Sequence, residues 1–158
     1  MRQYLDVFNQ YNAKPEFEVY DLGQINNIRF LVESGKVKSP VYIQFVLGVL
    51  GGMQATVENL VLMVSMAEKT LGRGNFVWSV VGAGRQQMLL GATALAMGGN
   101  VRVGLEDSIW LGKGIKAKSN AEQVEKIIRI ANEMSVEIAT PDEVRQILGT
   151  KGLASVAY

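Results

Sequence analysis

Gly98–Trp110 reads GGNVRVGLEDSIW, and this stretch decides the fold that we predict. The two glycines end a helix, and an alternating strand over 101–105 then runs into an adjacent acidic pair, Glu106 and Asp107. Side chains on a strand alternate with a period of two, so Arg102 and Glu106 share the face opposite the aliphatic residues. An arginine and a carboxylate on one face suit the inside of a barrel whose aliphatic face packs on helices. From this stretch alone, an ion pair that caps an ordinary strand is an equal alternative.

The rest of the chain repeats the same unit of a strand followed by a helix. Apolar periodicity, N-cap residues and glycines after helices place the boundaries. The predicted units are the strand 17–21 with the helix 22–33, the strand 41–47 with the helix 56–71, the strand 76–81 with the deeply buried helix 85–97, and the strand 101–105 with the helix 119–134. A helix over 1–12 precedes these units, a loop occupies 111–118, and an extended segment over 136–138 and a helix over 140–149 follow. Consecutive units of this kind predict parallel strands joined by right-handed crossovers.

Two architectures are built from such units, a doubly wound open sheet and a (β/α) barrel. A complete barrel takes about eight units and typically ~250 residues, which is more than the 158 residues of this chain. Polar residues recur on one face of the strands, as in the lining of a barrel mouth: Glu18, Gln44 or Tyr42, Ser79, Arg102 and Glu106. We therefore predict an α/β fold that is half of a TIM (β/α)8 barrel. It has about four parallel strands with flanking helices, in a single partial domain over residues 1–158.

Composition limits the classes of function. The formal net charge is +1, so the chain offers no basic stripe to a nucleic acid. The longest apolar run, 88–97, is too short to span a bilayer, and the first residues lack the apolar segment of a signal peptide. We therefore expect a cytoplasmic protein with no membrane or nucleic-acid partner. The chain contains neither cysteine nor histidine, so metal or proton-transfer chemistry must use carboxylates, or imidazoles supplied from elsewhere.

Two glycine-rich turns, 48–52 and 82–84, each lie between a predicted strand and a predicted helix. Backbone amides in such turns hold phosphate groups in many proteins, and Arg85 directly follows the second turn. Neither turn has the glycine spacing of a dinucleotide site, and tight turns also use glycine for conformational reasons alone. Both interpretations stay open at this point. The nearby lysines are interpreted as a solvated loop: Lys113, Lys116 and Lys118.

Long runs of the sequence resemble one enzyme family. The runs NVRVGLEDSIWLGKGIKAKSNAEQVEKIIRIA (100–131) and EIATPDEVRQILG (137–149) resemble the C-terminal part of the β-keto acid cleavage enzymes. PEFEVYDLG (15–23), IQFVLGVLGG (43–52) and WSVVGAGRQQ (78–87) are similar to the family's other strand ends, in order. The founding activity of this family is cleavage of 3-keto-5-aminohexanoate in lysine fermentation. The resemblance implies a TIM barrel with a divalent metal, usually zinc. It also implies condensation of a β-keto acid with acetyl-CoA to give acetoacetate and a CoA thioester.

The resemblance further implies roles for particular residues. The family's metal is held by a His-x-His pair on an early strand and by a glutamate after the last strand, which Glu106 matches. The neighbouring Asp107 matches a residue taken to transfer a proton. Arg102 matches an arginine that orients this aspartate and the substrate carboxylate, and Glu18 matches a candidate substrate contact. No residue is assigned to acetyl-CoA.

The sequence departs from the family pattern in two respects. The N-terminal half with its His-x-His pair is expected to be missing, and Gln86 and Asn100 stand where the family commonly has histidine. Three functions therefore stay open: a subunit completed by a partner chain, a non-catalytic half-barrel that pairs with itself, and a truncated product without activity. We expect a homo-oligomer or a complex with a complementing N-terminal half. We also expect Arg102 to be buried inside the barrel, and the sequence leaves the β-keto acid undetermined.

Overall fold

Four parallel strands form the main sheet of the protein. The computed structural model describes residues 2–152 and 155, and it orders these strands β1-β2-β3-β4. Their bounds are Glu16–Val19, Val41–Leu47, Phe76–Gly82 and Asn100–Val101. Sheet neighbours are also neighbours in the sequence, which is the order that successive β-α-β units produce. The predicted α/β fold with four parallel strands is confirmed.

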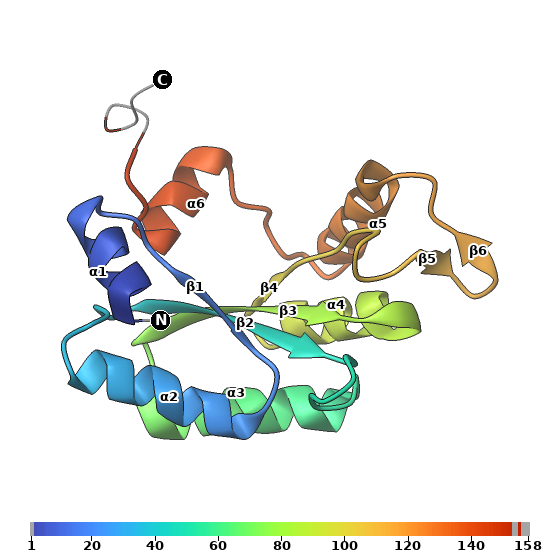
Figure 1. Cartoon of the computed structure of the whole chain (residues 1–158). Helices are drawn as coiled ribbons and strands as arrows, with labels where there is room; N and C mark the ends of the chain where they lie inside the picture. Colours follow the sequence, from blue (N-terminus) through green and yellow to red (C-terminus); the bar gives the residue numbers. More distant parts are fainter. Residues whose placement is uncertain (1, 153–154, 156–158) are drawn as a thin grey trace.

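Helices surround the sheet unequally (Figure 1). The helical segments are α1 Arg2–Gln10, α2 Leu22–Glu33, α3 Val57–Leu71, the 3-10 turn η1 Gly84–Gln86, α4 Gln87–Ala96, α5 Asn120–Glu133 and α6 Pro141–Leu148. In Figure 1, α2 and α3 lie side by side along one face of the sheet, whereas α6 lies on the opposite side. The predicted loop 111–118 contains a short hairpin of β5, Trp110–Gly112, and β6, Ile115–Lys116.

Local sequence signals set the helix boundaries. The side chains of Asp21 and Thr56 accept hydrogen bonds from first-turn N–H groups of α2 and α3, as N-cap residues do. Thr140 and Glu143 form the complete capping box at the start of α6 that the sequence predicts. Gly149 ends α6 with φ of 61°, a left-handed conformation that glycine adopts without strain. These interactions lie within a few residues of one another, so the sequence alone is sufficient to place them.

The core lies between the sheet and the helices α2, α3 and α4. Alternate residues of the strands point into it, and the buried members are Ile43, Phe45 and Leu47 of β2, Trp78 and Val80 of β3, Ile25 of α2, Leu60 of α3 and Leu90 of α4. The rings of Phe45 and Trp78 pack with their centroids 5.8 Å apart. Because side chains alternate along a strand, the intervening residues point to the opposite, less covered face.

Helix α4 is buried on one side only, which corrects the prediction that it is deeply buried. Leu90 and Ala94 are fully buried, whereas Leu89 is 54% exposed. Gly91 lets the buried side approach its neighbours closely, because a Cβ atom there would lie 2.9 Å from Val101 Cγ1. The helix belongs to the outer layer of the fold, so only the side that meets the sheet and α5 is covered.

The fourth strand is shorter than predicted. β4 contains two residues, and the predicted continuation is a turn in which the N–H of Ser108 donates to the carbonyl of Gly104 at 3.0 Å. The cause lies in other elements of the fold. Gln87 Oε1 accepts from the Gly104 N–H at 3.1 Å, and Asn120 Oδ1 accepts from the Leu105 N–H at 2.7 Å. These two amides are therefore not available to a sheet.

The sheet is open at both ends. In the part of the chain that the structure describes, β1 pairs only with β2, and β4 pairs only with β3. The predicted extended segment 136–138 forms no strand and lies in the lining of a groove beside β4. This arrangement is compatible with part of a TIM barrel. No helix among the described residues is long and apolar enough to cross a membrane.

Candidate active site

Strand register brings polar side chains of three strands into one row. Glu18 of β1 is paired in register with Gln44 of β2, and Gln44 is paired with Ser79 of β3. Gln44 and Ser79 are buried, and Gln44 Nε2 lies 3.3 Å from Ser79 Oγ. The predicted convergence of polar residues on one face is present. Of the alternatives Gln44 and Tyr42, it is Gln44 that occupies this row.

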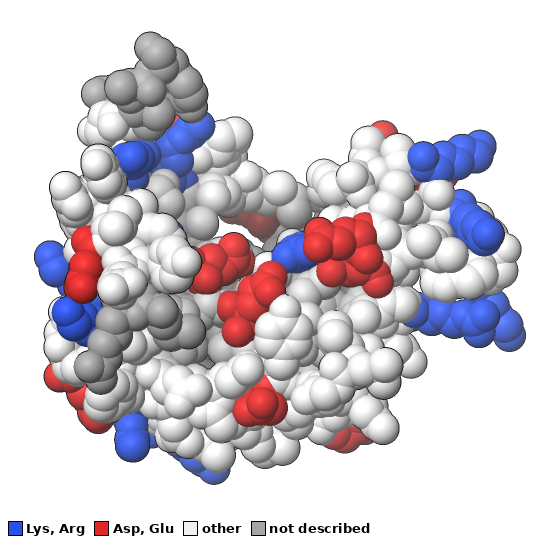
Figure 2. Space-filling view, in the orientation of Figure 1, with Lys and Arg blue, Asp and Glu red and all other residues white. Residues whose placement is uncertain are grey.

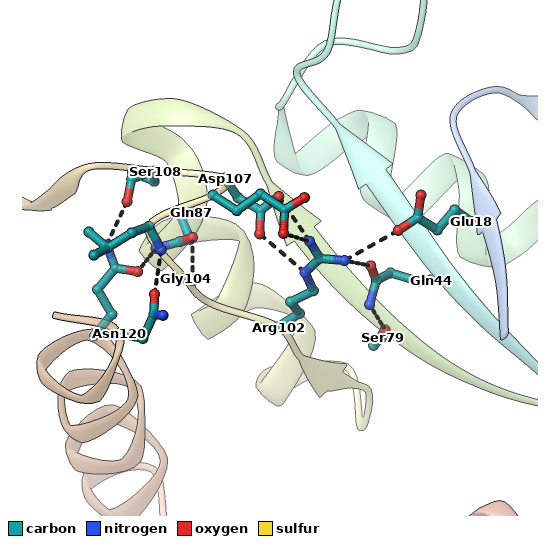
Figure 3. A network of polar contacts seen from close by, with 12 residues as sticks. Glu18, Gln44, Ser79, Gln87, Arg102, Gly104, Asp107, Ser108 and Asn120 are labelled. Carbon is teal, nitrogen blue, oxygen red and sulfur yellow. Dashed lines mark hydrogen bonds and ion pairs between the residues drawn. The ribbon is translucent and has the colours of Figure 1, made fainter.

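Arg102 joins this row to the acidic pair (Figure 3). Its Nη1 donates to Gln44 Oε1 at 2.9 Å and to Glu18 Oε1 at 3.2 Å. Its Nη2 donates to Glu106 Oε2 at 2.9 Å, and its Nε donates to Asp107 Oδ2 at 3.2 Å. On the surface, acidic side chains gather across the middle of this face around one basic patch (Figure 2). The four predicted site residues therefore lie together, because the three carboxylates all bind the guanidinium group of Arg102.

The members of this cluster differ in exposure. The side chain of Asp107 is 16% exposed and that of Glu106 is 83% exposed, although the two are adjacent in the sequence. The turn after β4 directs one carboxylate inward and the other into solvent. The side chain of Arg102 is 33% exposed, so this chain by itself buries it only partly and not fully as predicted for the inside of a barrel. The reason is that the polar face of the sheet is open above it.

Two further side chains belong to the cluster but were not among the predicted site residues. Glu16 Oε1 accepts from Gln44 Nε2 at 3.0 Å. The Tyr20 hydroxyl donates to Glu18 Oε2 at 2.6 Å, and this hydrogen bond raises the pKa of Tyr20. The available signal was the period of two along the strand, which places Glu16 and Tyr20, two residues before and two residues after Glu18, on the same face as Glu18.

The electrostatic environment makes Asp107 unlike an ordinary surface aspartate. Burial raises the pKa of its carboxyl group, the charges of Glu106 and Glu18 raise it further, and Arg102 acts in the opposite direction. Burial tends to lower the pKa of Arg102, but the carboxylates of Asp107, Glu106 and Glu18 outweigh this and raise it. Asp107 is therefore a carboxylate whose affinity for a proton is increased, held beside a guanidinium that stays charged.

We expect Arg102→Gln to raise the pKa of Asp107 further, because the substitution removes the charge that lowers it while burial remains. An aspartate with a raised pKa keeps its proton longer in the folded than in the unfolded state. The contribution of Asp107 to the free energy of unfolding therefore falls as pH rises from about 4, the usual aspartate pKa, through the pKa of Asp107 in the folded state. In the variant this loss should extend to higher pH. A carbon-13 NMR titration of the Asp107 carboxyl group measures the shift directly.

Arg145→Gln is the matched control for this titration. Arg145 also forms an ion pair, with Asp142 Oδ1 at 2.7 Å, but it lies on α6 outside the cluster. Its removal should leave the titration of Asp107 unchanged. An unchanged or lower Asp107 midpoint in Arg102→Gln would contradict the assignment of Arg102 as the group that holds this pKa down.

The second glycine-rich turn supports the acidic pair through its backbone. The N–H of Gly84 donates to the carbonyl of Asp107 at 2.8 Å. The guanidinium of Arg85 lies 5.0 Å from the centroid of the Trp110 ring, a cation–π distance. The Gly84 N–H and the Arg85 guanidinium are thus used in contacts within the protein. This favours the interpretation that the turn uses glycine for its conformation and does not bind a phosphate group. The lysines of the hairpin are exposed, as predicted: Lys113, Lys116 and Lys118.

Comparison with known proteins assigns the family. A model of the beta-keto acid cleavage enzyme family matches residues 1–150. The chain belongs to the β-keto acid cleavage enzymes. It is 43% identical over 143 residues to the 3,5-dioxohexanoate:acetyl-CoA acetone transferase of Paraburkholderia graminis, a match of 90% of this chain and 46% of that protein. It is 45% identical over 139 residues to the 3-keto-5-aminohexanoate cleavage enzyme of Fusobacterium nucleatum, a match of 88% of this chain and 48% of that protein.

A relative of lower identity gives similar coverage. The 3-dehydrocarnitine:acetyl-CoA trimethylamine transferase of Rhizobium meliloti is 36% identical over 136 residues, which is 86% of this chain and 43% of that protein. The chain thus spans about half the length of the curated relatives it matches, in their C-terminal half.

The side chains that could bind a metal show whether this chain of the β-keto acid cleavage enzyme family can hold one by itself. Glu106 and Asp107 are adjacent carboxylates, but both are bound to Arg102. The described residues contain no group of three or more His, Cys, Asp or Glu side chains placed to hold a metal ion. Zinc sites in proteins use three or four protein ligands. The residues present therefore do not fit a zinc site by themselves.

Proposed function

We propose that this chain forms the C-terminal part of a metal-dependent β-keto acid cleavage enzyme. The enzyme would condense a β-keto acid with acetyl-CoA to give acetoacetate and a new CoA thioester. Family membership supports the reaction class, and the names of several relatives include acetyl-CoA as a reactant. The observation that carries the proposal is the convergence of Glu18, Glu106 and Asp107 on Arg102. Barrel enzymes place their catalytic residues at the carboxyl ends of the strands, where these residues lie.

Asp107 is the proton-transfer residue in this proposal. A carboxylate whose pKa is raised by burial accepts a proton more readily near neutral pH than an ordinary aspartate does. Arg102 holds Asp107 through Nε at 3.2 Å and Nη2 at 3.4 Å. The five N–H groups of Arg102 already donate to side chains of the cluster, so the carboxylate of the substrate would bind this third-exposed side chain by displacing one of them. Glu18, on the far side of the guanidinium, is the proposed substrate contact.

Glu106 is the metal ligand that this chain contributes in the proposal. One of its carboxylate oxygens, Oε2, binds Arg102, and the side chain is otherwise largely exposed. The other ligands, a His-x-His pair in the family pattern, would come from the other half of the barrel, on the same polypeptide or on another chain. When bound, a divalent cation such as zinc supplies Lewis acidity.

We further propose that the remaining half of the barrel pairs with the open edges of the sheet. A groove of about 590 Å³ runs beside β4. Four exposed aliphatic side chains from α5, α6 and their connection line it: Val124, Ile138, Val144 and Ile147. Unpaired strand edges and exposed apolar grooves favour association. The same edges would also accept a second copy of this chain, which is the alternative of a self-paired half-barrel.

Reconstitution tests the proposal. Alone, the chain should scatter light as a species larger than a monomer, bind zinc weakly and produce no acetoacetate. Mixed with the N-terminal half of the Fusobacterium relative, it should bind zinc and form acetoacetate from acetyl-CoA and 3-keto-5-aminohexanoate, the substrate in that relative's name. A well-folded monomer at micromolar concentration would contradict the association. A reconstituted complex that forms no acetoacetate from any β-keto acid would contradict the reaction.

A further inference from the structure

Two glutamine side chains are buried behind the turn that carries the acidic pair. Gln87 of α4 is 2% exposed, and Gln123 of α5 is fully buried. Burying an amide costs free energy unless its polar atoms find partners. Both amides are satisfied, since no buried side-chain nitrogen or oxygen in the described part of the chain lacks a hydrogen-bond partner.

Three hydrogen bonds join these amides into a chain with one direction (Figure 3). The N–H of Gly104 donates to Gln87 Oε1 at 3.1 Å, and Gln87 Nε2 donates to Gln123 Oε1 at 3.0 Å. Gln123 Nε2 then donates to the backbone carbonyl of Ser108 at 2.6 Å. A backbone N–H can only donate and a carbonyl can only accept, so the two ends fix the orientation of both amides. We call this chain of hydrogen bonds the amide relay.

The amide relay holds both ends of one turn. Gly104 and Ser108 flank Glu106 and Asp107, and the N–H of Ser108 closes the turn on the carbonyl of Gly104 at 3.0 Å. Helices α4 and α5 therefore fix the turn from behind, while Arg102 binds both carboxylates in front. A leucine in place of either glutamine would fill the space but leave a buried backbone group of the turn without a partner.

We infer that Gln87 and Gln123 are positioning residues, which hold the turn 104–108 so that Glu106 and Asp107 face Arg102 and the open polar face. The catalytic consequence rests on the proposed function, whereas the effect on the turn rests on the relay alone. Positioning matters because a displacement of about 1 Å can lower a catalysed rate by about 10²-fold. Neither glutamine touches the reacting groups, so their effect is indirect.

Gln123→Glu is the sharpest variant because it barely changes the shape of the side chain. A carboxylate has no hydrogen to donate to the Ser108 carbonyl, but a protonated carboxyl group donates one and still accepts from Gln87. Burial raises the pKa of the introduced carboxyl group, so we expect the variant to keep the relay near pH 5 and to lose it once the pH exceeds that raised pKa. Gln123→Leu should lose the relay at every pH. Gln146→Glu, an exposed residue of α6, makes the same charge change and is the control.

Hydrogen exchange of the chain itself measures the effect on the turn. Once the introduced carboxyl group ionises, and at any pH in Gln123→Leu, the protection factors of the Gly104 and Ser108 amides should fall by about 10-fold or more, the usual cost of a lost buried hydrogen bond. The protection of Phe45 in β2 should stay unchanged, and that of the turn in Gln123→Glu should recover at pH 5. A uniform loss that includes β2, or no recovery at pH 5, would overturn the inference. Should Gln123→Glu not fold once its carboxyl group ionises, the uncharged Gln123→Leu, which also removes the donor to the Ser108 carbonyl, gives the same comparison with Phe45.

Kinetics of the reconstituted enzyme measure the catalytic consequence. Gln123→Leu, which lacks the relay at every pH, should lower kcat by about 10²-fold while KM for the β-keto acid changes only a few-fold, and Gln146→Leu should change neither. A raised KM with unchanged kcat would show that the relay does not position the acidic pair. An inactive wild-type complex would reject the proposed function, and hydrogen exchange would still decide whether the relay holds the turn.

Discussion

Asp107→Asn is expected to lower the turnover of the reconstituted enzyme by about 10²–10⁴-fold, the usual contribution of a proton-transfer group. The amide has nearly the shape of the carboxylate, and its oxygen still accepts a hydrogen bond from Arg102, so the substrate should bind almost as before. What the variant loses is the ability to take up a proton. We therefore expect the loss in kcat, measured as acetoacetate formation at saturating substrate, with KM within a few-fold.

The same substitution should not destabilise the protein near neutral pH. The net effect of burial and charge is to raise the pKa of Asp107, so its ionisation opposes folding, and a neutral side chain removes that opposition. Urea unfolding at pH 8 should show equal or greater stability for Asp107→Asn than for the wild type. Asp142→Asn, on the exposed face of α6, is the control for both measurements. Activity within a few-fold of wild type would show that Asp107 does not transfer the proton.

Glu106→Gln is expected to abolish tight binding of the divalent metal by the reconstituted enzyme, and turnover with it. In the proposal Glu106 is the one metal ligand of this chain, and three ligands are the fewest that hold zinc tightly. The fold should tolerate the change, because the side chain is 83% exposed and its ion pair with Arg102 is open to solvent. Metal content measured by mass spectrometry after dialysis, with circular dichroism to confirm folding, gives the result.

Asp107→Asn separates the two acidic residues in the same measurement. It should retain the metal while losing turnover, whereas Glu106→Gln should lose both. The opposite pattern, with metal lost from Asp107→Asn and kept by Glu106→Gln, would reverse the roles assigned to the pair. Exposed acidic residues elsewhere, such as Asp142, should affect neither quantity.

Much of the candidate site followed from the sequence, because its members lie at strand ends. Glu18, Arg102, Glu106 and Asp107 meet as expected, since parallel strands bring their carboxyl ends to one edge of the sheet. Gln87 was not predicted as part of the site. The signal available was a glutamine at the start of an otherwise apolar helix, which by itself does not show what the amide binds.

The sequence by itself determined the order of the elements, most of their boundaries and the family. Helix α2 and strand β2 occupy the predicted residues, because caps, apolar periodicity and glycine stops act within a few residues of one another. Only the tertiary structure decided how β4 ends. Side chains of Gln87 and Asn120, from two other helices, take the backbone amides that a longer strand would need. The resulting turn partly buries Asp107 and exposes Glu106, because partners distant in sequence compete with the local preference for a strand.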